Sequence, residues 1–463
     1  MGDHASRGEA PAAARPGPSE VPKGAPDPYA LLRSRSYVGL LVLAAVVGVP
    51  VAFVAYFFLA FVSQAQHLVF VGLPQALGFA SAPLWWPVLP LMLSGLVVGL
   101  TLRYLHGTGG HKPAEGFKAG GPTDPRDLPG IFVAAAATLC LGAVLGPEAP
   151  LIAIGSGLGV LAVRLAKRDA PQAAVGVIAG AGSFAAIATL LGSPITGAFL
   201  LMEAAGLAGT TMSVVLLPGL LAAGIGALIF VGLDSWTGLG SFSLAIPNIP
   251  ASAAPTLTEF LWAVGIGVVA AVLGQLIRRG GLALQPVVER RQVTLTPLVG
   301  LAVALAAIGF EAVTDQDATY VLFSGQSSLP VLVHQASTWS AGALVALLVC
   351  KSVAYSLSLS CFRGGPVFPG MFIGAAAGIA LSHLPGLPMI AGAAMGIGAM
   401  TAALLQLPLV AVLLPTLFLQ ADGVNLMPLV IVSVVVSYVI SARILPKLPG
   451  DPPAETVTAP SRQ

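Results

Sequence analysis

The chain has very little charge for its length. Of its 463 residues only 9% are Asp, Glu, Lys or Arg, whereas 56% are hydrophobic and the mean hydropathy is +0.91. Soluble domains carry about 25% charged residues, so this composition cannot cover a surface that faces water. The sequence therefore predicts an all-α integral membrane protein with the lipid bilayer as a partner. The formal net charge of +2 comes with no basic patch, so we expect no nucleic-acid partner.

Cysteines and catalytic constellations are also scarce. The three cysteines, Cys140, Cys350 and Cys361, lie in apolar runs without metal-ligand spacing, which favours core packing over a disulfide framework or a metal site. The sequence has no nucleophile triad, phosphate-binding loop or metal constellation. We therefore predict that the protein is not an enzyme and needs neither a cofactor nor a metal.

The two ends of the chain differ from the rest in composition. Residues 1–35 are rich in Pro, Ala and Gly and lack the apolar run of a signal peptide, which predicts a disordered tail. Arg33 and Arg35 precede the first apolar segment, so we predict a cytoplasmic N-terminus in the plasma (inner) membrane. Residues 446–463 are predicted to form a short polar C-terminal tail.

Long apolar runs are fewer than the composition suggests, because 55 Gly and 38 Pro interrupt them. A spanning helix needs about 20 apolar residues, and several segments here are shorter. Broken helices at membrane depth survive only inside protein or around a cavity, and such segments in both halves of a chain indicate a transport site. The predicted helical segments are 37–63, 83–105, 128–146, 147–166, 173–192, 194–206, 211–233, 258–278, 294–312, 337–361, 366–384, 387–406, 408–420 and 425–445.

The two halves of the chain correspond. "PLIAIGSGLG" from Pro150 and "PGMFIGAAAG" from Pro369 share the pattern Pro, three residues, Ile-Gly, three residues, Gly. A second pair of segments follows, around Pro194 and Pro408, at nearly the same offset. We therefore predict two repeats of inverted topology with broken and tilted helices, at 36–235 and 256–445, joined by a linker at 236–255.

One acid stands in this apolar setting, in the stretch "LGPEAPLIAIGSGLG". Prolines favour the first turn of a helix, and the first N–H groups of a helix have no internal partner and attract anions. If the helix starts at mid-membrane, Glu148 is a tethered anion that can gate an anion site. On spacing alone, a carboxylate that caps a helix at the membrane surface is an equal alternative. "RGGPVFPGMFIGAAAG" and "HGTGGHKPAEGF" offer two further helix starts.

These motifs resemble those of the CLC family of chloride channels and proton/chloride exchangers. The family pattern G-[KR]-E-G-P followed by I-G-x-x-x-G is similar to residues 146–150 and 154–159, and G-G-x-F-x-P is similar to 364–369. "GSPITGAFLLMEA", with Glu203, resembles a third family segment, and Lys351 stands where the family often has a membrane Lys. The resemblance implies a CLC-like homodimer with one pore per subunit. It also implies Glu148 as the gate and a bound chloride or other halide.

The resemblance further implies which residues surround the anion. These are Gly109, Gly110, His111, Lys112, Pro113, Gly146, Ala149, Gly365, Pro366, Val367 and Phe368.

The chain departs from the family pattern at several of these positions. Gly110 replaces the family's anion-contacting Ser, Pro366 lacks the N–H that the family offers, and the closing Tyr of the last helix has no match, since Tyr438 lies earlier. His111 and Lys112 either compensate with charge or are solvated loop residues. The inner proton-relay position is Ala204; the neighbouring Glu203 is a possible proton path or makes a structural hydrogen bond.

Three functions follow. The first is passive anion conduction by a CLC-type channel. The second is a proton-coupled anion exchanger. The third is a non-conducting or enzymatic membrane protein on the same fold.

Overall fold

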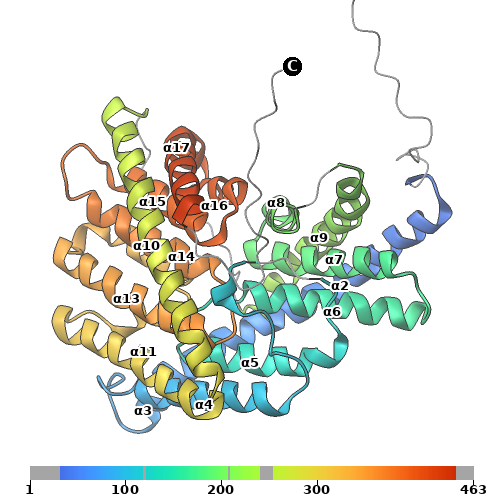
Figure 1. Ribbon diagram of the computed structural model, residues 1–463, viewed down its shortest axis with the longest axis horizontal. Helices are drawn as coiled ribbons and strands as arrows, with labels where there is room; N and C mark the ends of the chain where they lie inside the picture. Colours follow the sequence, from blue (N-terminus) through green and yellow to red (C-terminus); the bar gives the residue numbers. More distant parts are fainter. Residues whose placement is uncertain (1–31, 118–120, 207–208, 240–253, 445–463) are drawn as a thin grey trace, which may run out of the picture.

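The computed structural model describes residues 32–117, 121–206, 209–239 and 254–444, and over these ranges the chain forms helices and no β-strands. Most of the predicted tails and linker lie outside these ranges. Eight helices of the described part are long and apolar enough to cross a bilayer, by length and composition. The helices cross one another at many angles instead of forming a parallel bundle (Figure 1).

Most predicted segments are helices within a few residues of their expected bounds. The first half contains α2 (Arg35–His67), α4 (Val88–Tyr104), α5 (Leu128–Cys140), α6 (Glu148–Ala166), α7 (Gln172–Leu191), α8 (Pro194–Ala204) and α9 (Gly209–Thr237). The second half contains α10 (Leu257–Glu289), α11 (Gln292–Thr314), α13 (Ala341–Cys361), α14 (Val367–Leu381), α15 (Met389–Leu405), α16 (Pro408–Leu419) and α17 (Ala421–Ile444). Short elements that the sequence did not predict are η1 (Leu68–Gly72), α3 (Leu73–Ala76), η2 (Pro113–Glu115), η3 (Pro125–Asp127), η4 (Ala318–Tyr320), α12 (Ser328–His334) and η5 (Ala336–Thr338).

The repeated Ile-Gly-x-x-x-Gly pattern packs in the same way in both halves. A Cβ atom at Gly155 or Gly159 of α6 would overlap the backbone of α7, and one at Gly374 or Gly378 of α14 would overlap the backbone of α15. Small residues let helices approach this closely in a membrane, where packing drives association. The glycines of the pattern therefore hold each broken helix against the next helix in the chain.

Helices α4 and α11 pack closely and run antiparallel. Gly99 of α4 lies against Gln292 at the start of α11, whereas Leu91 of α4 lies against Gly300 further along α11. The loop that follows α4 therefore lies at one end of α11, and the loop that follows α11 lies at the other. At 1.5 Å per residue the 23 residues of α11 measure about 34 Å, enough to cross the hydrocarbon core of a bilayer, about 30 Å thick.

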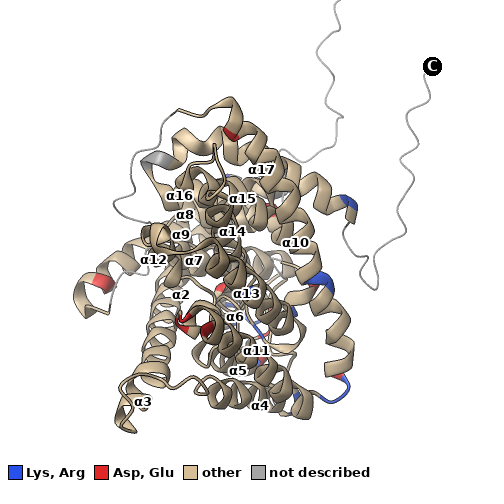
Figure 2. Ribbon diagram, turned by 90° about the vertical axis from the view of Figure 1, so that its left-hand side faces the viewer, with Lys and Arg blue, Asp and Glu red and all other residues tan. Residues whose placement is uncertain are grey.

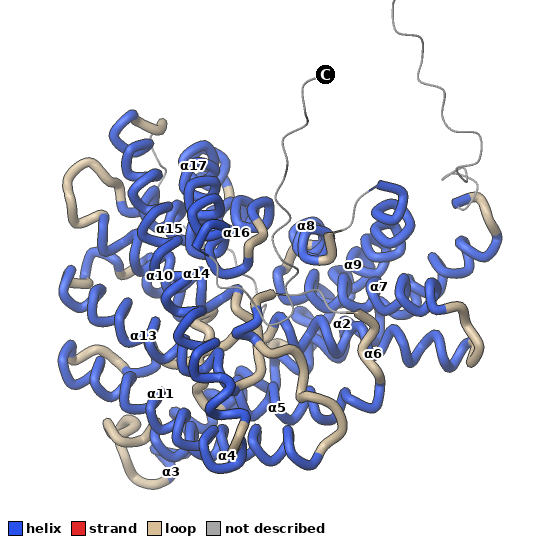
Figure 3. The backbone as a smooth tube through the Cα atoms, in the orientation of Figure 1, coloured by secondary structure: helices blue, strands red, loops and turns tan. Residues whose placement is uncertain are grey.

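Two loops lie inside the protein instead of on its surface. Residues 142–147, before α6, and 362–366, before α14, are all buried. Loop segments pass between the two groups of helices near the centre of the molecule (Figure 3), and few charged stretches interrupt the tan ribbon of Figure 2. Buried backbone groups need hydrogen-bond partners, so these loops must find them in each other or in nearby side chains.

Candidate functional site

The two interior loops pair with each other. The Gly146 N–H donates to the Gly365 carbonyl at 2.8 Å, and the Gly365 N–H donates to the Gly146 carbonyl at 2.6 Å, as an isolated antiparallel bridge. Directly after this bridge α6 begins at Glu148 and α14 begins at Val367. The bridge therefore brings the amide-rich starts of two helices, one from each half, together in the protein interior.

The Glu148 side chain crosses from one helix start to the other. It is 0% exposed, and its Oε1 accepts the Phe368 N–H of α14 at 2.8 Å. Its Oε2 has no hydrogen-bond partner among the described residues. The acid is thus a cap, as one interpretation of the sequence holds, but it caps the other half's helix inside the protein and not its own helix at the surface. A carboxylate in this place occupies a position that favours any small anion.

Glycine at two positions leaves room for this carboxylate. A Cβ atom built at Gly146 would overlap the carboxylate atoms of Glu148, and one built at Gly365 would overlap Oε2. The pair of loops therefore forms a seat for the acid that larger residues would fill.

The helix start that the sequence offered in "HGTGGHKPAEGF" begins no α-helix in the described part of this loop. After Gly109 and Gly110, whose φ angles of 65° and 103° are left-handed, Pro113 begins only the single 3₁₀ turn η2. Gly116 ends that turn with a φ of 99°, which a residue with a Cβ rarely adopts. No hydrogen bond between the described atoms of this loop and the Glu148 carboxylate is present.

The structure ties His111 and Lys112 to other groups. The Lys112 ammonium lies 2.7 Å from Oε1 of Glu289, at the end of α10, so a carboxylate balances its charge. The His111 ring Nε2 hydrogen-bonds the Gly116 carbonyl within its own loop. Both residues therefore hold the loop in place, and Lys112 does so through an ion pair that spans 177 residues of sequence.

Two cavities reach the residues on either side of Glu148. The first, of about 300 Å³, is lined by Ala149 and by residues of the loop after α4, among them Thr108, Gly110 and His111; we call it the Ala149 cavity. The second, of about 320 Å³, is lined by Pro147, Leu145 and residues of the loop after α11; we call it the Pro147 cavity. They share no lining residue. The loop that lines the first cavity leaves from one end of α11, and the loop that lines the second leaves from the other end.

Two acids, Asp124 and Asp127, also line the Ala149 cavity, and both are paired. The backbone N–H of Arg126 donates to Asp124, which lowers the pKa of that carboxyl, and the Arg164 guanidinium lies 3.5 Å from it. Asp127 lies 2.6 Å from the His106 ring. Their cationic partners offset part of the negative charge on this wall of the cavity.

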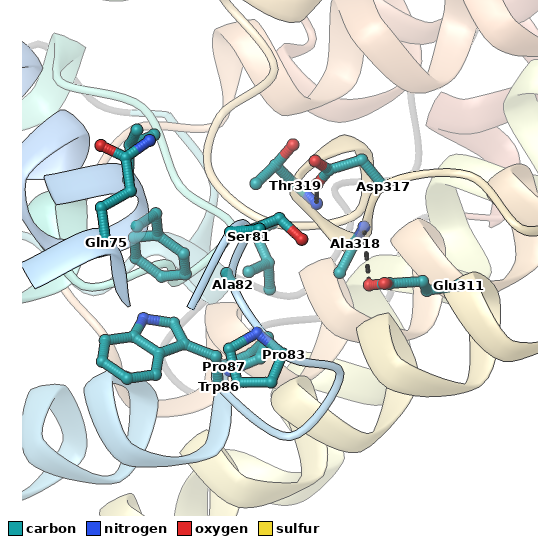
Figure 4. Close-up of a pocket in the computed structure, with 14 residues that line it drawn as sticks. Gln75, Ser81, Ala82, Pro83, Trp86, Pro87, Glu311, Asp317, Ala318 and Thr319 are labelled. Carbon is teal, nitrogen blue, oxygen red and sulfur yellow. Dashed lines mark hydrogen bonds between the residues drawn. The ribbon is translucent and has the colours of Figure 1, made fainter. Parts of the chain in front are cut away.

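A further pocket, of about 360 Å³, lies away from the site at the far end of α11 (Figure 4). None of the predicted site residues lines it. Its carboxylates stabilise a turn: Glu311 accepts the Ala318 N–H at 3.3 Å, and Asp317 accepts the Thr319 N–H at 2.7 Å. The described residues contain no group of three or more His, Cys, Asp or Glu that could hold a metal.

Glu203 of α8 caps a helix of the other half. Its two carboxylate oxygens accept the Leu409 and Val410 N–H groups, each at 2.9 Å, at the start of α16. These bonds are the structural hydrogen bonds that the sequence offered as one interpretation of this residue. A carboxylate at a helix N-terminus stabilises that helix.

Sequence reasoning missed two buried polar residues beside the site. The Tyr355 hydroxyl of α13 donates to the Pro366 carbonyl at 3.4 Å, and the ring is 0% exposed. Arg363, in the loop before α14, is 5% exposed. The only available signal was that a phenol and a guanidinium stand in or next to an apolar segment, where polar residues are costly.

Lys351 of α13 holds the turn that leads to the Pro147 cavity. It is 0% exposed, and its ammonium lies over the Phe372 ring at 4.4 Å. It donates to the carbonyls of Tyr320, Val321, Leu322 and Phe323 at 2.8–3.4 Å.

A membrane-embedded helical protein with broken helices that meet at a buried acid between two cavities is a membrane transport protein by architecture. The sequence profile of the family described as "Voltage gated chloride channel" matches residues 94–442. The match covers most of the chain, so the protein belongs to this family of ion-transport proteins.

Curated relatives and solved structures agree with this family. The chain is 28% identical over 363 residues to YfeO of Escherichia coli O7:K1 (strain IAI39 / ExPEC), provisionally described as an ion-transport protein; the match covers 77% of this chain and 82% of YfeO. A slow cyanobacterial Cl⁻/H⁺ antiporter has a similar fold, with a TM-score of 0.70 and 20% identity over 88% of this chain and 94% of that one. A CLC-type fluoride/proton antiporter also has a similar fold, with a TM-score of 0.65 and 22% sequence identity. That match covers 88% of this chain and 96% of the antiporter chain.

Proposed function

We propose that the protein moves a small anion, chloride or a similar halide, across the membrane past Glu148, which acts as the gate. The observation that carries the proposal is the bond between the buried Glu148 carboxylate and the Phe368 N–H at the start of α14. A free anion of similar size would be favoured at the same helix start. The side chain and the anion therefore compete for one place.

The donors at this place come from the two helix starts. We assign the anion to the space between Gly146, Ala149, Gly365, Val367 and Phe368, with Pro366 contributing no N–H. The loop from Gly109 to Pro113 forms the wall of the Ala149 cavity, through which the anion reaches the site. Protonation of Glu148 removes its charge, so the anion displaces it more readily at low pH.

The test is anion efflux from chloride-loaded vesicles with a potassium ionophore as the electrical shunt. Wild-type flux should rise as the pH falls, because the protonated carboxyl no longer competes as an anion. Glu148→Gln keeps the shape but cannot ionise, so its flux should be higher at neutral pH and independent of pH. Glu203→Gln serves as the control, because Glu203 caps α16 away from this helix pair.

Two outcomes would contradict the proposal. If chloride, fluoride, bromide and nitrate all fail to move, the protein is not an anion transporter. If flux occurs and Glu148→Gln keeps the wild-type pH profile, Glu148 is not the gate.

A proton-coupled exchanger is the second candidate, since the structures of similar fold are described as antiporters. Both oxygens of Glu203 are engaged at the start of α16, and this favours passive movement over a relay through that residue. A chloride gradient that drives protons uphill in the same vesicles would establish the exchanger instead.

The membrane arrangement belongs to the same proposal. We infer a homodimer with one pore per subunit, two halves of inverted topology, and a plasma-membrane location with a cytoplasmic N-terminus. The matched packing of α6 on α7 and of α14 on α15 supports the correspondence of the halves.

A further inference from the structure

Arg363 is a buried cation held by backbone oxygens alone. Its Nη1 donates to the Cys361 and Phe362 carbonyls at 3.1 and 3.2 Å, and its Nε donates to the Thr108 carbonyl at 3.0 Å. No carboxylate of the described residues lies within ion-pair distance of it. The guanidinium therefore joins the end of α13 to the loop after α4 and keeps its full charge.

A buried charge without a counter-charge is expensive, so its presence calls for a reason. The carbonyls at the C-terminal end of α13 supply charge-assisted hydrogen bonds and the negative end of the helix dipole. These interactions offset part of the desolvation cost, and none of them brings a full negative charge into contact with the guanidinium.

The field of this charge acts on the Ala149 cavity. Thr108, whose carbonyl Arg363 binds, lines this cavity together with Gly110 and Ala149. The stem of Arg363 also packs on Gly109, because its Cγ would lie 3.7 Å from a Cβ built there. Lys112 in the same loop is different, since Glu289 balances its charge.

We propose that Arg363 is the fixed positive charge that draws the anion into the Ala149 cavity and sets the protein's anion affinity, while its hydrogen bonds hold Thr108 and Gly109 as the cavity wall. This proposal rests on the proposed function and names the residue that favours an anion over a neutral or cationic solute on this side of Glu148. Glu289 and Glu115 oppose this field from α10 and η2.

The test uses full-length protein in detergent and measures binding of chloride, fluoride and nitrate by isothermal titration calorimetry. Arg363→Gln should weaken binding by about tenfold or more, because it removes a full positive charge near a site of low effective dielectric. Arg363→Lys keeps the charge and loses the planar, multi-donor guanidinium, so the anion affinity of this variant should stay within about threefold of wild type. Arg279→Gln is the control, because it removes an exposed arginine that binds a single backbone carbonyl, that of Ile444.

Glu289→Gln tests the same field without touching Arg363. It removes an opposing charge and leaves Lys112 with only the longer contact to Glu115, at 4.0 Å, so anion binding should tighten by several-fold. If both Arg363 variants fail to give a monodisperse, cooperatively melting protein, this variant decides, and unchanged affinity in Glu289→Gln overturns the proposal.

The other outcomes also decide. Wild-type affinity in Arg363→Gln, or equal losses in Arg363→Gln and Arg363→Lys, would show that the charge of Arg363 does not set affinity. Wild-type protein that neither binds nor transports any of these anions would instead refute the proposed function itself.

Discussion

At the scale of single residues, Gly146 controls whether Glu148 can occupy its seat. The three atoms nearest to a Cβ at this position all belong to the Glu148 carboxylate, and the Gly146 φ is not left-handed, so the backbone tolerates alanine. Gly146→Ala should displace the carboxylate, but its Cβ also narrows the place that the anion shares with the carboxylate, so anion flux at neutral pH should stay below that of Glu148→Ala. A steric overlap of this kind costs at least about 1.4 kcal/mol, or tenfold in occupancy of the seat.

The double variant separates displacement of the acid from exclusion of the anion. In a Glu148→Ala background the clashing carboxylate is gone, so adding Gly146→Ala should lower the flux only through the space that its Cβ takes from the anion. A double variant whose flux equals that of Glu148→Ala would show that the anion does not occupy the place next to Gly146.

Tyr355 offers a hydroxyl beside the site, and its bond to the Pro366 carbonyl is long at 3.4 Å. We expect this O–H to turn toward a bound anion. The hydroxyl would then replace one of the hydrogen-bond donors that are missing at Gly110 and Pro366. Tyr355→Phe should then raise the half-saturating anion concentration about two- to tenfold, the worth of one hydrogen bond of 0.5–1.5 kcal/mol. Tyr37→Phe, which removes a hydroxyl bound to the distant Val214 carbonyl, is the control. Equal anion affinities in wild type and Tyr355→Phe would remove Tyr355 from the site.

At the scale of helices, the close packing of α14 on α15 depends on glycines, which have no side chain at the contact. A Cβ at Gly374 would overlap the backbone of Gly396, whereas a Cβ at Gly309 of α11 meets no atom within 4 Å. Gly374→Ala should lower the free energy of unfolding by about 1–3 kcal/mol. Gly309→Ala should leave it unchanged or raise it by up to about 1 kcal/mol, because alanine favours helix. Thermal unfolding in detergent measures both, and equal melting temperatures would contradict the packing argument.

The helices themselves were largely predictable, and the breaks between them were predictable for the same reason. Apolar length and the Gly/Pro interruptions depend on local sequence, so α6 and α14 begin within a residue of their predicted starts. The loop at 109–116 was not predictable, because a single 3₁₀ turn and a half-length helix begin with the same Gly/Pro signal. Gly116 ends η2 because its φ angle is positive, and the sequence alone does not show that angle.

At the scale of the whole molecule, the site depends on contacts that no local pattern reveals. The family resemblance implied that residues of 146–149 and 365–368 surround one anion, and the bridge between Gly146 and Gly365 joins these two segments. The Lys112–Glu289 pair and the bond from Arg363 to Thr108 join residues 177 and 255 positions apart. Apolar periodicity carries no information on such pairs, so these partners required the folded structure.

The arrangement of α2, α4 and α11 also predicts which side of the membrane each cavity faces. Phe70 and Gln75, just beyond α2, line the same pocket as Glu311 near the end of α11. The start of α2 therefore lies near the other end of α11, where the loop that contains Thr108 leaves α4. With a cytoplasmic N-terminus, the Ala149 cavity faces the cytoplasm and the Pro147 cavity faces the outside.

Single cysteines test this assignment. In a background with Cys140, Cys350 and Cys361 replaced by alanine, Thr108→Cys should react with a membrane-impermeant thiol reagent in inside-out vesicles and not in intact cells. Ser327→Cys, in the lining of the Pro147 cavity, should show the reverse, because a helix about 34 Å long separates the two loops. If both cysteines react from the same side, the two cavities do not form a path through the membrane, and a gate at Glu148 would have nothing to connect.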